Sequence, residues 1–171
     1  MKNILLEKGQ ELHEKLCEIS DYIYNNPELG NEEYKAVEAL TTFLKEHNFQ
    51  VECPIADMDT AFKATFDSGK PGMTIGYLCE YDALPKIGHG CGHNLLGAGA
   101  VTGAIMIKRF LEQEGIPGTL RFYGCPEEEL LSGKVKMAYY HMFDGCDMAL
   151  SWHPMSANMI YDEGYLASAS A

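Results

Sequence analysis

The sequence has few basic residues and no long apolar run, and each absence excludes a class of function. It has 13 lysines and arginines against 25 acidic residues, which gives a formal net charge of -12 over 171 residues. Nucleic acids and anionic membranes are bound through basic patches, so we expect neither as a partner. A transmembrane helix needs about 20 mostly apolar residues, and the chain has no such stretch. The run Ile4–Leu6 is too short for a signal peptide, which favours a cytoplasmic location.

Cysteines are few and irregularly spaced, so a disulfide framework is not expected. They are Cys17, Cys53, Cys79, Cys91, Cys125 and Cys146. A chain of this length can bury a core without cross-links, and in a reducing cytosol most of these thiols should be free. Repeats, low-complexity tracts and linkers are absent as well. A composition of 46% hydrophobic and 22% charged residues is typical of one soluble globular domain.

Hydrophobic periodicity predicts helices that alternate with strands. Helices are expected over residues 3–25, from Asn31, which can cap the second helix, to 47–48, over 95–114, and from 132 or 133 to 143. Strands are expected over 49–52, 61–66, 73–79, 119–123 and 147–152. From the third strand on, strands and helices alternate, which is typical of a largely parallel sheet covered by helices. The sequence therefore predicts an α/β fold.

The stretch Gly88–Asn94 places two histidines and a cysteine among three glycines, directly before an apolar helix. Cys91 and His93 are residue types that bind zinc and similar divalent metals. The positive end of the following helix should favour a thiolate at Cys91. The alternative for this stretch alone is a tight turn with a buried cysteine and a structural histidine.

Polar residues follow three of the predicted strands, at the point where each strand ends. They are Glu80 and Asp82, then Glu128 and Glu129, then His153, and the Cys91/His93 loop leaves the first of these ends. In a parallel α/β sheet, functional groups collect just beyond the carboxyl ends of the strands. We therefore expect these residues, far apart in sequence, to meet at one edge of the sheet.

Each of these residues also has a plain structural interpretation. The run Glu127–Glu129 could be the charged start of a helix, and His153 could be a core histidine. Asp82 could be a turn residue, or it could orient a histidine ligand from behind. His89 either supports the ligands or has no role. The convergence of all segments is what favours a mixed sulfur, nitrogen and oxygen site, in which one glutamate binds metal and its neighbour takes a proton from water.

These residues resemble the M20 family of metallopeptidases and amidohydrolases, in particular its aminoacylase/carboxypeptidase-like branch, which includes p-aminobenzoyl-glutamate hydrolases and dipeptidases. The matching stretches follow the family's order over nearly the whole chain. They are residues 27–30, 80–85, 88–97, 122–126 with Glu128-Glu129, and 151–154. The resemblance implies a zinc-peptidase-like, three-layer domain with a mostly parallel sheet. It also implies metal-dependent hydrolysis of amide bonds in small N-acyl amino acids or dipeptide-like substrates.

The resemblance further implies a divalent-metal centre of two ions, zinc or manganese. Its ligands would be Cys91, as a bridging thiolate, with His93, Glu129 and His153. Glu128 would be the general base, and Asp82 would orient rather than bind. Glu80 stands where most of the wider family has a metal-binding histidine, so the chain follows the cysteine branch. The family usually has a small residue at the place of Glu127. The assignment of the general base and the metal ligand within Glu127–Glu129 therefore stays open by one position.

Family members continue well beyond the length of this chain. Residues 1–171 would form the N-terminal portion of the catalytic domain, ending at 167–171 where a lid domain would begin. The lid mediates homodimerisation in the family and a later segment supplies another histidine ligand, so these residues alone could be inactive.

Two other functions compete with this interpretation. Cys91, near His93 at a helix start, could be the nucleophile of a thiol hydrolase that needs no metal. The chain could also be a non-catalytic remnant that binds metal weakly.

Overall fold

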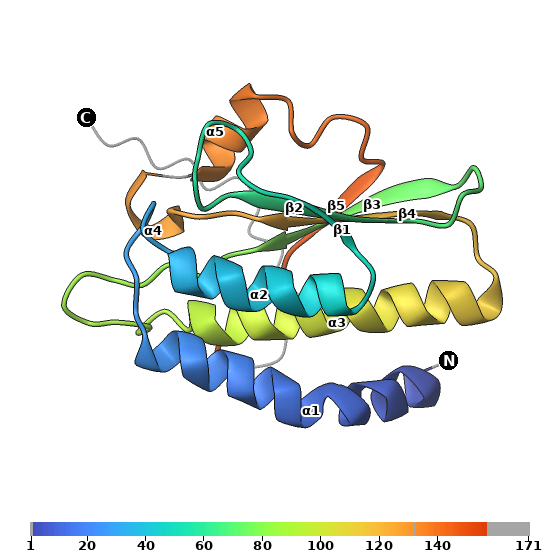
Figure 1. Ribbon diagram of the computed structural model, residues 1–171, viewed down its shortest axis with the longest axis horizontal. Coiled ribbons are helices and arrows are strands. Elements are labelled where there is room, and N and C mark those ends of the chain that lie inside the picture. Colours follow the sequence, from blue (N-terminus) through green and yellow to red (C-terminus); the bar gives the residue numbers. More distant parts are fainter. Residues whose placement is uncertain (1, 132, 157–171) are drawn as a thin grey trace.

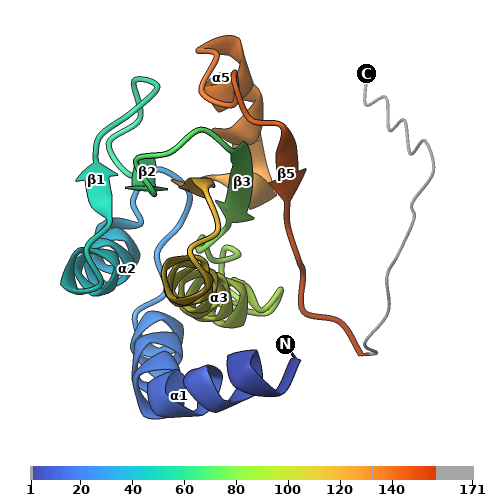
Figure 2. The same cartoon turned by 90° about the vertical axis from the view of Figure 1, so that its right-hand side faces the viewer.

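A five-stranded sheet between two layers of helices organises the chain (Figures 1 and 2). We describe it from a computed structural model over residues 2–131 and 133–156. The helices are α1 (Lys2–Asn25), α2 (Tyr34–Glu46), α3 (His93–Glu114), α4 (Glu128–Leu131) and α5 (Gly133–Tyr139). The strands are β1 (Gln50–Glu52), β2 (Phe62–Asp67), β3 (Met73–Cys79), β4 (Gly118–Gly124) and β5 (Met148–Leu150), in the spatial order β1-β2-β4-β3-β5.

Four of the five strands run in one direction. Strand β3 pairs in parallel with β4 on one side and with β5 on the other. Strand β2 is antiparallel to both β1 and β4, so it alone runs the other way. The predicted mostly parallel α/β sheet is confirmed. Because β4, β3 and β5 are parallel neighbours, their carboxyl ends lie at one edge of the sheet.

The sheet separates two apolar clusters, which makes the fold three-layered. Helices α2 and α3 cover one face and α1 packs against α3, while α5 lies over the other face (Figures 1 and 2). In β4, Leu120 and Phe122 point into the larger cluster under α1–α3. Tyr123 points the opposite way, where Met137 of α5 packs beside it. Within the described residues, no helix has the length and apolar character needed to cross a membrane.

The start of α2 differs from the sequence-based prediction. Asn31 does not cap the helix, because its backbone is left-handed, with φ 65°, and the helix begins at Tyr34. The carboxylate of Glu28 accepts hydrogen bonds from the backbone N–H groups of Lys35, at 2.9 Å, and Ala36, at 3.1 Å. A side chain from the preceding loop therefore satisfies the free donors of this helix end.

Helix α3 approaches the segment after β5 through small residues. Its N-cap Gly92 has φ 85°, and its C-cap Gly115 has φ 63°. A Cβ at Gly99 would lie 2.7 Å from Cζ2 of Trp152, and one at Gly92 would lie 2.8 Å from Cγ of Pro154. The missing side chains let Trp152 and Pro154 pack against α3, on either side of His153. The predicted boundary at 167–171 lies outside the described residues.

Candidate metal centre

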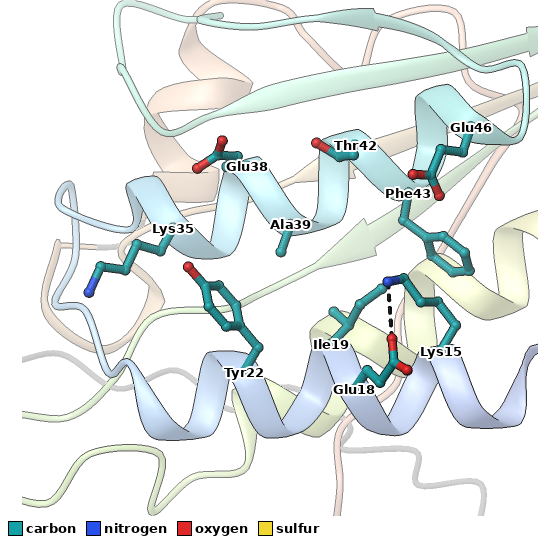
Figure 3. A pocket seen from close by; sticks show the side chains of 10 residues that line it. All are labelled: Lys15, Glu18, Ile19, Tyr22, Lys35, Glu38, Ala39, Thr42, Phe43 and Glu46. Carbon is teal, nitrogen blue, oxygen red and sulfur yellow. Dashed lines mark hydrogen bonds and ion pairs between the residues drawn. The ribbon is translucent and has the colours of Figure 1, made fainter.

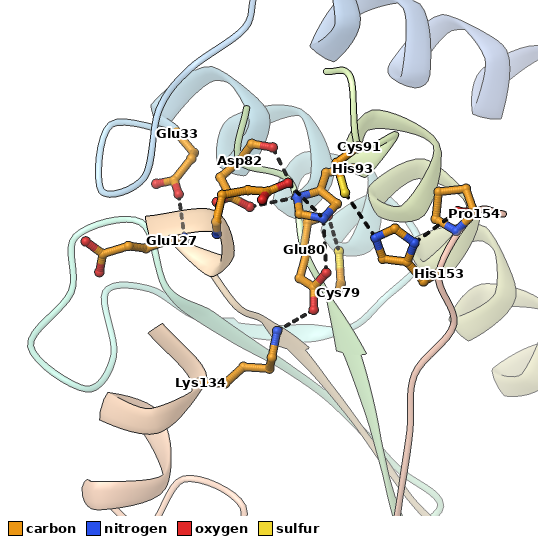
Figure 4. Close-up of polar contacts among 11 residues, drawn as sticks. Glu33, Cys79, Glu80, Asp82, Cys91, His93, Glu127, Lys134, His153 and Pro154 are labelled. Carbon is orange, nitrogen blue, oxygen red and sulfur yellow. Dashed lines mark hydrogen bonds and ion pairs between the residues drawn. The ribbon is translucent and has the colours of Figure 1, made fainter. Parts of the chain in front are cut away.

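The side chains that follow β3, β4 and β5 meet at the carboxyl edge of the sheet, as expected. Figure 4 shows Glu80 and Asp82 after β3, Cys91 and His93 at the start of α3, and His153 beyond β5, with their polar atoms directed toward one another. The segment after β4 brings Glu128 and Glu129 to the same place. The structure thus gathers at one point the residues that the sequence singled out for the site.

His93 is the centre of this cluster. Its ring is fully buried, and Nδ1 lies 2.8 Å from Oδ1 of Asp82. The other nitrogen, Nε2, lies 3.3 Å from Oε2 of Glu80 and 3.9 Å from Oε1 of Glu129, yet it makes no hydrogen bond with any residue that the structure describes. Asp82 therefore holds the ring from behind, and Nε2 faces the other carboxylates. This is the arrangement in which histidine ligands of metals are usually oriented.

The electrostatics of the pair Asp82–His93 follow from this geometry. Burial by itself would lower the pKa of His93, but the hydrogen bond to Asp82 and the negative charges of Asp82, Glu80 and Glu129 raise it above its usual range. Burial would likewise raise the pKa of Asp82, but hydrogen bonds from His93 and from the backbone N–H of Glu129 lower it. Asp82 is thus held as a carboxylate that accepts from two donors.

Cys91 and His153 form the solvent-facing side of the cluster. Sγ of Cys91 lies 3.3 Å from Nε2 of His153, and the rings of His93 and His153 have centroids 5.5 Å apart. His153 is exposed, and its Nδ1 lies 3.0 Å from the carbonyl oxygen of Pro154. The alternative of a core histidine at this position is therefore wrong.

The surroundings of Cys91 in the protein without metal oppose the expected thiolate. Burial, a hydrogen bond with Glu129 and the negative charges of Glu129, Glu128 and Glu80 together raise the pKa of Cys91 to about 12. Burial and the full negative charges of three carboxylates oppose the favourable effect of the α3 dipole on a thiolate. A free thiol of this kind is a poor nucleophile at neutral pH, which disfavours the thiol-hydrolase alternative.

The three consecutive glutamates occupy different surroundings. Glu128 forms a group with Glu80 and His93. Glu129 lies near His93, and its buried Oε1 has no hydrogen-bond partner in the described part of the chain. Glu127 instead accepts a hydrogen bond from Nδ2 of Asn31, and Figure 4 shows its carboxylate pointing away from His93. Glu128 and Glu129, rather than Glu127, therefore lie beside His93.

The donor atoms fit a divalent cation. Two trios share His93, namely Cys91-His93-His153 and Glu80-His93-Glu128, and within each trio the ligand atoms lie within 4.8 Å of one another. Glu129 belongs to neither trio, although it is the second acid near Nε2. Buried atoms such as Nε2 of His93 and Oε1 of Glu129 are costly to leave without partners. Sulfur, imidazole and carboxylate donors together suit zinc and similar divalent metals.

Sequence reasoning missed two charged residues beside the cluster. Lys134, in the first turn of α5, forms an ion pair with Oε1 of Glu80, so one acid of the group is partly neutralised. Glu33 is fully buried and accepts a hydrogen bond from the backbone N–H of Glu127 at 2.8 Å. Neither has a motif of its own, although Glu33 follows the 27–30 stretch closely. The ring nitrogens of His89 are buried and have no hydrogen-bond partner among the described residues, and His89 lies outside both trios.

One groove of the described part lies away from this cluster. It has a volume of about 460 Å³ and runs between α1 and α2 (Figure 3). Charged side chains such as Lys15 and Glu18, paired at 3.1 Å, line it together with Tyr22 and Phe43. It contains neither of the two donor trios. The candidate metal ligands therefore lie at the strand ends rather than in this groove.

Comparison with known proteins identifies relatives over most of the chain, although no family model matches. The chain is 39% identical to one of the subunits of p-aminobenzoyl-glutamate hydrolase from Escherichia coli, over 92% of this chain and 36% of the relative. It is 32% identical to the Xaa-Arg dipeptidase of Mus musculus, over 94% of this chain and 40% of the relative. The chain thus spans about two fifths of the length of these curated relatives.

Solved structures share the fold. An aminohydrolase from methicillin-resistant Staphylococcus aureus superposes with a TM-score of 0.80 and 28% identity, over 91% of this chain and 43% of that one. A dinuclear metal-binding peptidase of the M20 family from Bacillus subtilis superposes with a TM-score of 0.76 and 21% identity, over 85% of this chain and 44% of that one. In its motifs, in related sequences matched over about two fifths of their own length and in its fold, the chain is thus similar to metallopeptidases and amidohydrolases of the M20 family.

Proposed function

We propose that the chain carries the metal centre of an enzyme that hydrolyses amide bonds in small N-acyl amino acids or dipeptides. The observation that carries the proposal is the buried Nε2 of His93, which has no hydrogen-bond partner within residues 2–131 and 133–156 and faces a group of carboxylates and a thiol. The names of the relatives agree with it, since p-aminobenzoyl-glutamate and Xaa-Arg dipeptides each contain an amide bond to an amino acid.

In this proposal Cys91, His93, Glu129 and His153 would hold the metal. When bound, a divalent cation such as zinc or manganese supplies a Lewis acid that polarises the substrate carbonyl and makes water more acidic. Asp82 keeps Nδ1 of His93 occupied, so that Nε2 stays directed at the site. Binding of a cation also removes the cost of burying unpartnered polar atoms of His93 and Glu129.

Glu128 is the proposed general base. Its carboxylate lies in the group with Glu80 and His93, but the ion pair of Lys134 is made with Glu80 rather than with Glu128. A free carboxylate at this position can take the proton from the attacking water and deliver it to the leaving amine. Glu127 is excluded from either role in the proposal, because it is bonded to Asn31 on the other side of the segment.

The assignment of Glu128 and Glu129 is tested by paired amide variants in the longest available form of the protein. Glu128→Gln should retain zinc and lose most of its turnover, on the order of 100-fold or more, since only proton transfer is removed. Glu129→Gln should lose zinc affinity. Metal content after dialysis and hydrolysis of N-acyl amino acids and dipeptides are the measurements.

Two outcomes would contradict the proposal. If Glu128→Gln loses zinc and Glu129→Gln keeps it, the two roles are exchanged. If turnover of the wild-type protein survives exhaustive chelation, the metal-dependent mechanism is wrong. The choice of zinc or manganese, the cytoplasmic location, dimerisation through a lid and low activity of residues 1–171 alone stay predictions. The same assays, carried out with zinc and with manganese on residues 1–171, test the choice of metal and the activity of these residues alone.

A further inference from the structure

The loop between α1 and α2 contains the stretch Pro27–Gly30, which resembles the M20 family but supplies none of the candidate metal ligands. It nevertheless contacts both segments that carry the candidate site. The carbonyl oxygen of Glu28 accepts a hydrogen bond from the backbone N–H of Ala83, at 2.8 Å, directly after Asp82. Glu33, at the other end of the loop, reaches the segment after β4. The loop therefore joins the ends of β3 and β4.

Glu33 is anchored on two sides. Its Oε1 accepts the backbone N–H of Glu127 at 2.8 Å, and its Oε2 accepts the hydroxyl of Thr60 at 2.6 Å. The carbonyl oxygen of Thr60 in turn accepts the hydroxyl of Tyr81 at 2.6 Å, next to Glu80. Glu33, Thr60 and Tyr81 are all fully buried. A buried carboxylate with this fixed set of donors is a rigid point of attachment.

Glu127 is held in an unfavourable conformation at this attachment. Its φ of 61° is left-handed, which costs a residue with a side chain about 1 kcal/mol or more. Its side chain is bonded to Asn31, and a Cβ at Gly30 would lie 2.9 Å from Cγ of Glu127 and 3.0 Å from its Cα. The loop therefore leaves space for Glu127 in one position and holds it there.

Two residues further on, a second anchor fixes the same segment. The backbone N–H of Glu129 donates to Oδ2 of Asp82 at 2.9 Å. Glu128 lies between the two anchored N–H groups, and Figure 4 shows Glu33 and Glu127 beside the cluster but outside it. The direction of the Glu128 and Glu129 side chains thus depends on both attachments.

We propose that Glu33 is a positioning residue of the metal centre, which fixes the backbone at Glu127 and thereby aims the carboxylates of Glu128 and Glu129. The inference rests on the proposed function, because it assigns those carboxylates to metal binding and proton transfer. Without the acceptor at Glu33, the N–H of Glu127 is buried and unpaired and its left-handed conformation loses its support. Partners behind the ligands of a metal typically change its affinity by 10- to 100-fold.

The test compares Glu33→Gln, which keeps an oxygen for the Glu127 N–H, with Glu33→Met, which has similar length and no acceptor. Glu32→Gln is the matched control, since Glu32 is the exposed neighbouring acid. The first measurement is hydrogen exchange of the Glu127 amide by NMR in the metal-free protein. The second is zinc affinity by competition with a chelating dye.

We expect Glu33→Gln and Glu32→Gln to stay within about threefold of the wild-type zinc affinity and to retain a protected Glu127 amide. Glu33→Met should bind zinc about 10- to 100-fold more weakly and lose that protection. Recovery by glutamine separates positioning from a general loss of packing or of charge. Wild-type affinity and protection in folded Glu33→Met, or equal losses in the methionine and glutamine variants, would overturn the proposal.

A second variant covers the case in which Glu33→Met does not fold. Gly30→Ala leaves Glu33 intact but places a methyl group against Glu127. It should also expose the Glu127 amide and weaken zinc binding, and unchanged values of both would overturn the proposal. If the wild-type protein binds no zinc, the proposed function fails instead. The amide exchange of the Glu33 variants then still decides whether Glu33 fixes the segment.

Discussion

At the scale of single residues, the carboxyl group of Glu33 should give the protein a distinctive pH dependence. Burial raises the pKa of Glu33 to about 7, against the opposing effect of hydrogen bonds from Thr60 and from the N–H of Glu127. The folded state therefore holds this proton more tightly than the unfolded chain does. The contribution to stability is full below pH 4.5, the usual pKa, and is lost as the pH rises through about 7.

We therefore predict that the free energy of unfolding of the wild-type protein falls relative to that of Glu33→Gln between pH 4.5 and 7.5. The relative change should reach up to about 3 kcal/mol, because one pKa unit corresponds to about 1.4 kcal/mol. Urea titrations of both proteins with chelator present give the difference at each pH. Parallel pH profiles would show that Glu33 titrates alike in the folded and unfolded chains.

The site residues that the sequence predicts are those that follow a recognisable strand or open a helix. Cys91, His93 and His153 could be found because their residue types bind metal and their positions lie at element ends. Glu33 could not, since its role depends on a 94-residue separation from Glu127 and on burial that no local pattern indicates. The opposition to a thiolate at Cys91 could not be predicted either, because it depends on burial and on carboxylates from other segments.

At the scale of elements, α3 packs closely against the segment after β5, because Gly99 has no side chain that would contact Trp152. We predict that Gly99→Ala weakens zinc binding by about 10-fold, since its Cβ would lie 2.7 Å from Trp152 and displace the residue next to His153. The fluorescence of Trp152, the only tryptophan of the chain, should change as well. Competition with a chelating dye and emission spectra are the measurements.

Gly103→Ala in the same helix is the control for this prediction. Its Cβ would lie 3.5 Å from the hydroxyl of Tyr77, which is ordinary contact. Alanine at this position should therefore leave zinc affinity and emission unchanged and stabilise the helix by up to about 1 kcal/mol. Equal effects of the two substitutions would show that helix propensity, rather than the contact with Trp152, is responsible.

Most elements could be predicted from periodicity, and the misses have local causes. The bounds of β3 match the structure because an apolar run with a turn on its amino side is unambiguous. The start of α2 was misplaced because the side chain that accepts hydrogen bonds from its first N–H groups belongs to Glu28. Glu28 lies several residues before the helix rather than at its N-cap position. The short helix α4 was not predicted, since four residues give no period. The antiparallel orientation of β2 follows from pairing, which the sequence of one strand does not specify.

At the scale of the whole molecule, the residues of the candidate metal centre come from segments that are far apart in the sequence. Cys91 and His93 open α3, Glu128 and Glu129 follow β4, and His153 lies beyond β5. An unfolded chain cannot present these groups at one point, so a cation that binds them should bind the folded state almost exclusively. Metal loading should therefore stabilise the entire fold rather than the site alone.

We predict that zinc at about 100 times its dissociation constant adds about 2.7 kcal/mol to the free energy of unfolding. For a chain of this size that corresponds to a rise of about 5–10 °C in the melting temperature, and excess chelator should reverse it. His153→Ala should lose much of the rise, because it removes one donor of the trio with Cys91 and His93.

His141→Ala is the control, since His141 is exposed and paired only with Asp144 among the described residues. A zinc-induced rise that survives in His153→Ala but is lost in His141→Ala would place the stabilising site away from the strand ends.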